Sequence, residues 1–311
     1  MEGVTTLQIP MLVFEFMIFG FLIIDGVIVA ELISSLRKVN MLPLKILALL
    51  IAVLAWGTVF YGSFIEPKIL RVEEKTIDLN LDDMNGELDV IVVSDIHVGP
   101  YKKARWARRV TDKINELDAD AVFMIGDYVF SKTEQIDMLE AHKDLTLPVY
   151  AVLGNHDHEF ADPDIIADTL SGWGVDMLRN RAVEIDAKNG DKIDVAGIDD
   201  LWFSASPTSA METVDDNTPT IMLTHNPDFI LEQEAERVDL VLAGHTHCGQ
   251  IRLPWIGSVP QVPTRLGNDW DCGEYDYGDG HKLFITPGVG ETGPRARLFN
   301  PPTINIIHIT Y

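Results

Sequence analysis

Aspartate, histidine and asparagine side chains occur in five short segments of the chain, and each segment follows or ends a run of apolar residues. The segments are Asp95-Ile96-His97, Gly126-Asp127, Gly154-Asn155-His156-Asp157, His225 and Gly244-His245-Thr246-His247. A carboxylate shared between two cations, with imidazoles and an amide oxygen around them, makes a binuclear hydrolytic centre. Such a centre activates water at neutral pH and stabilises the oxygens of an in-line displacement at phosphorus. The residue types therefore predict a metal-dependent phosphoesterase.

The apolar runs before these segments are typical of buried strands. They lie at residues 88–94, 121–125, 149–153, 221–223 and 240–242. Open α/β sheets place their ligand sites at the carboxyl ends of the strands, so we expect the five segments to meet at one edge. The glycines let the backbone turn sharply beside a crowded site. A single segment of this kind would often be a simple turn or cap, but five in the same position argue against coincidence.

The remaining pattern predicts two sheets with helices outside them. Helical segments separate the strands in the first half, and hairpins are more frequent in the second, where Asn189-Gly190 is a two-residue turn signal. We expect an α/β fold in which two sheets pack face to face with helices outside them, a four-layer α/β/β/α sandwich. Residues 255–280 are rich in Gly, Pro and Asp and show little periodicity. We expect them to form one long loop over the site.

Two apolar segments near the amino terminus are long enough to cross a membrane. Residues 11–30 are apolar except for Glu15 and Asp25, and residues 46–65 carry no charge. About 20 helical residues span the ~30 Å hydrocarbon layer. The two carboxylates weaken the first segment, and a buried helix pair in a soluble protein is the alternative. The expected domains are a membrane anchor of two transmembrane helices over 1–65, a linker over 66–86 and a catalytic domain over 87–311.

The cations around the two apolar segments give opposing indications of the side of the membrane. The connector at 34–45 holds one arginine and two lysines, which favours a cytoplasmic connector and an extracytoplasmic catalytic domain. Residues 66–75 hold a further arginine and two lysines, which argue the reverse. We expect an integral membrane protein whose catalytic domain is extracytoplasmic, with the cytoplasmic side left open.

Composition bears on the partners of the chain. It has 24 basic and 48 acidic residues, a net charge of −24. Because polyanion binding relies on Lys and Arg releasing counterions, we expect no nucleic-acid partner; otherwise the acidity indicates solubility. The only cysteines, Cys248 and Cys272, are too few for a disulfide scaffold. Two free thiols are the default expectation, and one bridge between them is the alternative.

The five segments together resemble those of the calcineurin-like metallophosphoesterase superfamily, over about residues 87–309. The resemblance implies two divalent metal ions, and the mixed nitrogen and oxygen donors suit Mn, Fe or Zn. It implies Asp95, His97 and His247 at the first metal, Asn155, His225 and His245 at the second, and Asp127 as the bridge.

His156 and Asp157 are the predicted catalytic groups. His156 adjoins the expected ligand Asn155, so its ring can face the leaving-group oxygen and protonate it. A histidine that only supports the ligands is the alternative. Many members of the superfamily carry an aspartate where this chain has Phe130, three residues after the bridging Asp127. Asp157 is the expected substitute partner for His156.

Three further runs resemble the membrane-associated phosphodiesterases typified by YaeI and YkuE. They are Gly197-Ile198-Asp199-Asp200, the run from His247 to Pro254, and Pro287-Gly288-Val289-Gly290. Some members of that branch cleave the pyrophosphate of UDP-2,3-diacylglucosamine during lipid A synthesis. The resemblance therefore implies a place in lipid metabolism.

Arg252, Arg295 and Arg297 are candidate phosphate clamps, because a guanidinium fork matches phosphate oxygens. Salt bridges to the abundant carboxylates are the alternative. We expect Arg252 and Arg297 to bind substrate. The sequence thus predicts a membrane-anchored phosphohydrolase that cleaves phosphodiester or pyrophosphate bonds, with amphiphilic substrates favoured. A phosphodiesterase for soluble nucleotides and a non-catalytic metal-binding membrane scaffold are the alternatives.

Overall fold

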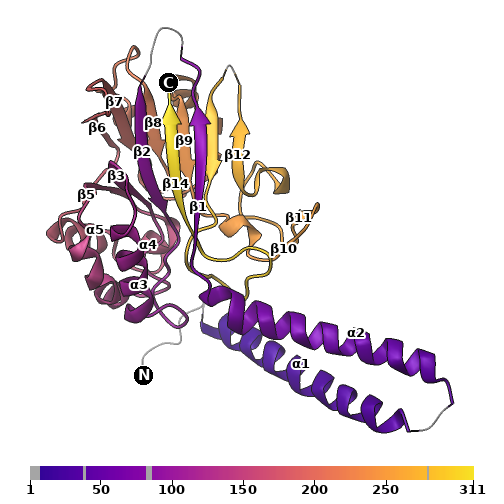
Figure 1. The fold of residues 1–311 in the computed structure, drawn as a ribbon. Coiled ribbons are helices and arrows are strands. Elements are labelled where there is room, and N and C mark those ends of the chain that lie inside the picture. The colour runs from indigo at the N-terminus through magenta and orange to yellow at the C-terminus, as the bar shows by residue number, and fades with distance from the viewer. Residues whose placement is uncertain (1–7, 38–39, 82–85, 279) are drawn as a thin grey trace.

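A pair of long helices leaves one end of an α/β domain (Figure 1) in the computed structural model, which describes residues 8–37, 40–81, 86–278 and 280–311. Helix α1 is Gln8–Ser35 and α2 is Leu42–Phe60. A π turn (Tyr61–Ile65) and a 3-10 turn (Glu66–Lys68) continue α2 into the domain. Parts of the basic connector and of the expected linker lie outside the described residues.

The two helices pack on each other, and the rest of the protein leaves their apolar surface uncovered. Spans of 25 and 27 residues are long and apolar enough to cross a membrane, and 6% of each apolar window is buried. Phe16 and Leu54 are 76% and 71% exposed. A soluble protein would bury such a surface, so the alternative of a buried helix pair does not hold. Glu15 forms an ion pair with Arg295, which places this carboxylate where α1 meets the catalytic domain.

Two six-stranded sheets form the centre of the domain. The order in the first is β1 (Arg71–Asp78), β14 (Thr303–Thr310), β2 (Glu87–Val93), β3 (Ala121–Ile125), β4 (Val149–Val152) and β5 (Asp176–Met177). The order in the second is β12 (Gly273–Asp276), β13 (Lys282–Ile285), β9 (Leu240–Ala243), β8 (Thr220–Leu223), β7 (Lys192–Gly197) and β6 (Arg181–Asp186). Strands β2, β3 and β4 are parallel, as are β8, β9 and β13, so each set ends at a common edge.

Three apolar clusters hold the layers together. The middle cluster joins the sheets through residues such as Phe123 and Ile221. Outside the first sheet pack α3 (Ala104–Asn115), α5 (Pro163–Gly172) and the 3-10 segment Thr133–Asp144. Short helical turns, including α6 (Pro207–Ala210), cover the second sheet. The predicted four-layer sandwich is therefore confirmed, with an outer layer of single turns on one side.

The expected linker at 66–86 contains a strand that joins the first sheet, because β1 pairs in parallel with β14 along all eight of its residues. One predicted loop differs from the structure. Residues 255–280 are not one loop, because β11 (Gly257–Ser258) pairs with β10 (Arg252–Leu253) and β12 borders the second sheet. Strands of two to four residues are too short to show a period in the sequence.

Candidate metal centre

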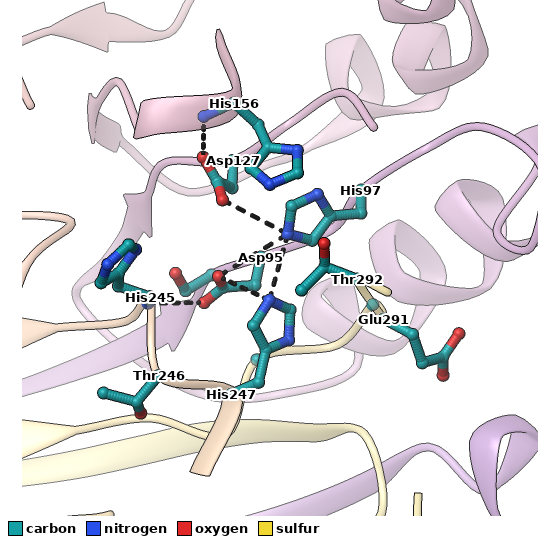
Figure 2. A network of polar contacts seen from close by, with 12 residues as sticks. Asp95, His97, Asp127, His156, His245, Thr246, His247, Glu291 and Thr292 are labelled. Carbon is teal, nitrogen blue, oxygen red and sulfur yellow. Dashed lines mark hydrogen bonds and ion pairs between the residues drawn. The ribbon is translucent and has the colours of Figure 1, made fainter. Parts of the chain in front are cut away.

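The seven side chains expected to bind metal come from the carboxyl ends of five strands. Asp95 and His97 follow β2, Asp127 follows β3, Asn155 begins α4 (Asn155–Glu159) after β4, His225 follows β8, and His245 and His247 follow β9. All seven residues are at most 5% exposed. The two sheets thus contribute to one buried polar site (Figure 2).

Imidazole nitrogens and carboxylate oxygens converge on the middle of this site. Oδ2 of Asp127 lies 3.3 Å from Nε2 of His97 and 3.2 Å from Nε2 of His225. Oδ1 of Asp95 lies 3.2 Å from Nε2 of His247. The Nε2 atoms of His97 and His247 are 3.1 Å apart. Asp127 therefore stands between histidines that come from different sheets.

Two buried polar atoms indicate that a group from outside the chain completes the site. Oδ1 of Asn155 and Nε2 of His245 have no hydrogen-bond partner among the described residues. Leaving such an atom unpaired costs about 1–3 kcal/mol, and buried polar groups in folded proteins are nearly always satisfied. Nδ1 of His225 lies 2.8 Å from the carbonyl oxygen of Ile125, so the hydrogen bond there leaves Nε2 free to bind a cation. The donor set fits divalent cations of the Mn, Fe or Zn type.

The backbone at the site is held in an uncommon conformation. Asp95, His97, Asp127, His245 and His247 have φ angles of 54°, 47°, 56°, 69° and 49°. Left-handed backbone at non-glycine residues costs of order 1 kcal/mol or more and persists where surrounding structure imposes it. The site is also crowded, since a Cβ at Gly244 would lie 2.6 Å from Oδ2 of Asp95. These turns aim the side chains inward.

Burial and neighbouring charge set the protonation states of the site. Burial raises the pKa of Asp95 to about 6. Burial alone would raise the pKa of Asp127, but the surrounding imidazoles, His225 first, hold it well below its ordinary value. Burial lowers the pKa of His97 and of His245 to about 3, so both rings are neutral and able to bind a cation. Burial opposes the charged form of His225, but Asp127 raises its pKa to about 10, so a cation that binds Nε2 would displace a proton from it.

His156 faces the centre and is oriented by the backbone. Its Nδ1 lies 2.8 Å from the carbonyl oxygen of Phe130, and its ring lies 4.5 Å from that of His97 (Figure 2). Its backbone N–H donates to Oδ1 of Asp127 at 2.8 Å. The carbonyl of Phe130 therefore supplies the hydrogen bond for which the sequence suggested Asp157.

Asp157 has a different role from the catalytic one predicted. It is fully buried, and Oδ2 accepts hydrogen bonds from the N–H groups of Asp127 at 2.9 Å and Gly154 at 3.0 Å. Oδ1 accepts from the N–H of Tyr128 at 3.0 Å. The carboxylate thus ties the turn after β3 to the turn after β4, and it is a positioning residue.

The predicted phosphate clamps are engaged elsewhere. Arg297 is fully buried and donates to four backbone carbonyls, so its fork is not available to substrate. Nη1 of Arg252 lies 2.7 Å from Oδ2 of Asp271, which is the salt-bridge alternative. Arg295 pairs with Glu15. An arginine has the same appearance in a sequence whether it meets phosphate, carboxylate or carbonyl.

Glu66 and Asn300 link the helix pair to the centre, and no pattern in the sequence indicated this contact. Nδ2 of Asn300 donates to the carbonyl of His247 at 2.8 Å, and its backbone N–H donates to Oε1 of Glu66 at 2.6 Å. Glu66, in the turn that continues α2, is 2% exposed. Two hydrogen bonds therefore join the end of the helix pair to a predicted metal ligand.

Cys248 and Cys272 form a disulfide, so the default expectation of two free thiols was wrong. Their Cα atoms are 4.8 Å apart, and 24 positions separate them in sequence. Cys248 directly follows His247 and is fully buried. The bridge therefore fastens the segment from 248 to 272 beside the centre.

Comparisons with known proteins agree with this geometry. Residues 88–249 match the family described as calcineurin-like phosphoesterase. Phosphodiesterase YaeI of Escherichia coli is 31% identical over 223 residues, 67% of this chain and 77% of the relative. The uncharacterized metallophosphoesterase YkuE of Bacillus subtilis is 27% identical over 266 residues, 82% of this chain and 91% of the relative. A transmembrane protein with metallophosphoesterase domain from Danio rerio is 29% identical over 247 residues, 75% of this chain and 55% of the relative.

The family match covers more than half of the chain and includes the segments that build the centre. The two apolar helices and the transmembrane relative indicate membrane association. The predicted enzyme class, a metal-dependent phosphoester hydrolase, is confirmed. The chain belongs to the calcineurin-like phosphoesterase family.

Proposed function

We propose that the chain is a membrane-anchored hydrolase that cleaves a phosphodiester or pyrophosphate bond in an amphiphilic substrate at the membrane surface. The observation that carries the proposal is the contact of Glu66 with Asn300 and of Asn300 with His247. A flexible tether would leave the distance between the site and the bilayer undefined. Here buried hydrogen bonds hold the centre next to the end of α2, so the phosphate of a lipid-linked molecule would lie within its reach.

The proposed ligand set uses every donor that converges on the centre. Asp95, His97 and His247 would hold one divalent cation, Asn155, His225 and His245 would hold a second, and Asp127 would be shared between the two sets. When bound, such a pair activates water and neutralises charge on the phosphate oxygens. Burial of the ligands excludes bulk water and strengthens each of these interactions.

The chain's own residues orient the substrate and move a proton. The carbonyl of Phe130 accepts from Nδ1–H of His156 and turns Nε2 inward, so the cationic ring, protonated on both nitrogens, gives its Nε2 proton to the leaving-group oxygen and becomes neutral. Asp157 keeps the turns after β3 and β4 fixed, so that Asp127 and His156 stay in register.

The catalytic domain is proposed to be extracytoplasmic. Disulfides such as Cys248–Cys272 persist in oxidising compartments and are rare in the cytosol. The basic connector gives the same indication by the positive-inside rule. On that side the substrate would be an exported amphiphilic phosphoester, whereas a UDP-2,3-diacylglucosamine-type precursor belongs to the cytoplasmic pool.

The test uses the full-length protein, stripped of metal and reloaded with Mn. We would compare a phosphate monoester, an aryl phosphodiester, and an acylated pyrophosphate of the UDP-diacylglucosamine type with its deacylated counterpart. We expect Mn-dependent cleavage, and faster turnover of the acylated than of the deacylated molecule. Equal rates on that pair would contradict an amphiphilic substrate. Absence of Mn-, Fe- or Zn-dependent turnover on all of them would contradict the hydrolase itself.

A further inference from the structure

An apolar patch lies on the surface of the β10–β11 hairpin, outside the metal centre. We call the group Leu253, Trp255, Ile256 and Phe299 the hairpin patch. Trp255 is fully exposed, and Ile256 and Phe299 are 72% and 61% exposed. All four residues line one open cleft, so they form a single surface. Contiguous exposed apolar surface of this kind marks an interaction site more often than isolated apolar side chains do.

The patch lies beside the point where α2 enters the catalytic domain. The carbonyl of Gly62, just after α2, accepts a hydrogen bond from the N–H of Arg297 at 2.8 Å. The carbonyl of Leu298, the residue after Arg297, accepts a hydrogen bond from the N–H of Arg252 at 2.9 Å. Arg252 is the first residue of the hairpin. In Figure 1 the hairpin projects to the same side of the domain as that toward which α1 and α2 extend. A bilayer around the helices would therefore face the patch.

Two aromatic residues of the patch keep a backbone conformation that does not favour them. Trp255 and Phe299 have φ angles of 66° and 53°. Bulky side chains are genuine outliers in this region, where Gly and Asn are usual. Neither side chain gains burial inside the protein in return. The stabilisation that offsets the strain is therefore expected from outside the chain.

We propose that the hairpin patch inserts into the interfacial layer of the bilayer that α1 and α2 span. The inference rests on the proposed membrane anchoring. Trp and neighbouring aliphatic side chains favour the boundary between headgroups and acyl chains. With this third contact the domain cannot tilt freely about the helix pair, and the entrance to the centre stays at a fixed height above the bilayer.

The test places an environment-sensitive NBD probe on a single cysteine in the full-length protein. Because the native cysteines form a disulfide, only the introduced one reacts. The variants are Trp255→Cys, Ile165→Cys as the matched exposed control on α5, and Leu50→Cys as the membrane control on α2; the control residues are 50% and 61% exposed. Each is reconstituted in phosphatidylcholine/phosphatidylglycerol nanodiscs with brominated acyl chains. We expect several-fold stronger quenching at Trp255→Cys than at Ile165→Cys, with a blue-shifted emission.

The outcomes separate the two proposals. Quenching at Leu50→Cys, with Trp255→Cys no more quenched than Ile165→Cys, would overturn the hairpin contact and leave the anchor intact. No quenching at Leu50→Cys would overturn the anchor, and the hairpin contact with it. A blue shift at Trp255→Cys without quenching by lipid would mean that protein covers the patch, which also overturns the proposal. Ile256→Cys gives a second position, and Mn-dependent cleavage of an aryl diester checks that each variant is folded.

Discussion

The metal centre and the hairpin patch depart in opposite ways from the usual distribution of side chains. At the centre, carboxylates, imidazoles and an amide are buried, and some of their polar atoms have no partner in the described chain. In the patch, an indole and its apolar neighbours face solvent. Burying unpaired polar groups and exposing clustered apolar ones are both unfavourable. Each region is therefore complete only with a group from outside, which is a cation in one case and an apolar layer in the other.

A short stretch of chain joins the two regions. His247 belongs to the centre, Cys248 carries the disulfide, and Arg252 begins the hairpin. Non-glycine residues hold left-handed backbone in both regions. The two regions differ in the partner that completes them. Substitutions at the metal centre should therefore change metal binding, and substitutions in the hairpin patch should change membrane contact.

Of the substitutions predicted here, Asp127→Asn at the metal centre should have the largest effect. The substitution keeps the shape of the bridging side chain and removes the charge that lies 3.3 Å and 3.2 Å from two imidazoles. We expect turnover to fall by about 10³-fold or more, because the loss of charge weakens cation binding worth several kcal/mol to the transition state. Mn-dependent activity and bound metal, counted by mass spectrometry, measure the effect. Activity within tenfold of the wild type would contradict the bridging role, and the thermal unfolding of metal-free protein is the control for folding.

Removal of the disulfide should affect the connection between the two regions. In the double variant Cys248→Ser, Cys272→Ser the 24-residue loop is no longer closed. The chain-entropy model gives a loss of about 3 kcal/mol in the free energy of unfolding, and a Tm lower by roughly 6–12 °C. Thermal unfolding in detergent measures it. The wild type in reductant should match the variant, and an unchanged Tm in both would contradict a stabilising bridge.

His156→Ala should distinguish proton transfer from metal binding within the centre. The ring is held by the carbonyl of Phe130 and is proposed to protonate the leaving group. General acid catalysis contributes about 10²-fold or more when the leaving group is poor. We expect such a loss for alkyl phosphodiesters and a much smaller loss for activated aryl esters, measured as kcat with each class. An equal loss for both classes, with reduced metal content, would indicate a ligand instead.

The centre was predictable because its signals are local. Each of the five segments combines an apolar run with a polar side chain after it, and the topology of parallel sheets brings such strand ends together. Asp127 and His225 could thus be placed in one site although they lie 98 positions apart (127 and 225) in the chain. The layer architecture followed from the same pattern.

The contacts that tie the centre to the helix pair were not predictable in this way. Glu66 and Asn300 are 234 positions apart, and neither follows a strand in the manner of the ligands. The burial of Arg297 depends on carbonyls whose directions only the folded loop defines. The patch could not be recognised as one surface, because Trp255 lies in a segment rich in Gly and Pro, where the two-residue strand β11 leaves no period.

His142 is a buried histidine outside both regions, so it shows what burial alone does to an imidazole. Its substitution should have the smallest of the predicted effects. His142 is 1% exposed, its Nδ1 lies 3.0 Å from Oγ1 of Thr111, and burial lowers its pKa to about 4. Its unfolded pKa is near 6.5, so as the pH falls below 6.5 the unfolded chain takes up the proton first and the folded state loses stability. The loss should reach about 2 kcal/mol at pH 5 and level off below pH 4.

In His142→Gln this contribution should be absent, although the variant can be less stable at every pH. Thermal unfolding of wild type and variant in detergent, between pH 8 and pH 4, measures the difference in slope. If the two proteins lose stability in parallel, His142 is charged or exposed in the folded state. If the stability of the variant depends less on pH than that of the wild type, His142 is buried and neutral in the folded state. The fold would then hold a neutral imidazole without a partner from outside the chain. The histidines of the metal centre would then differ from His142 because they converge on one point, and not because they are buried.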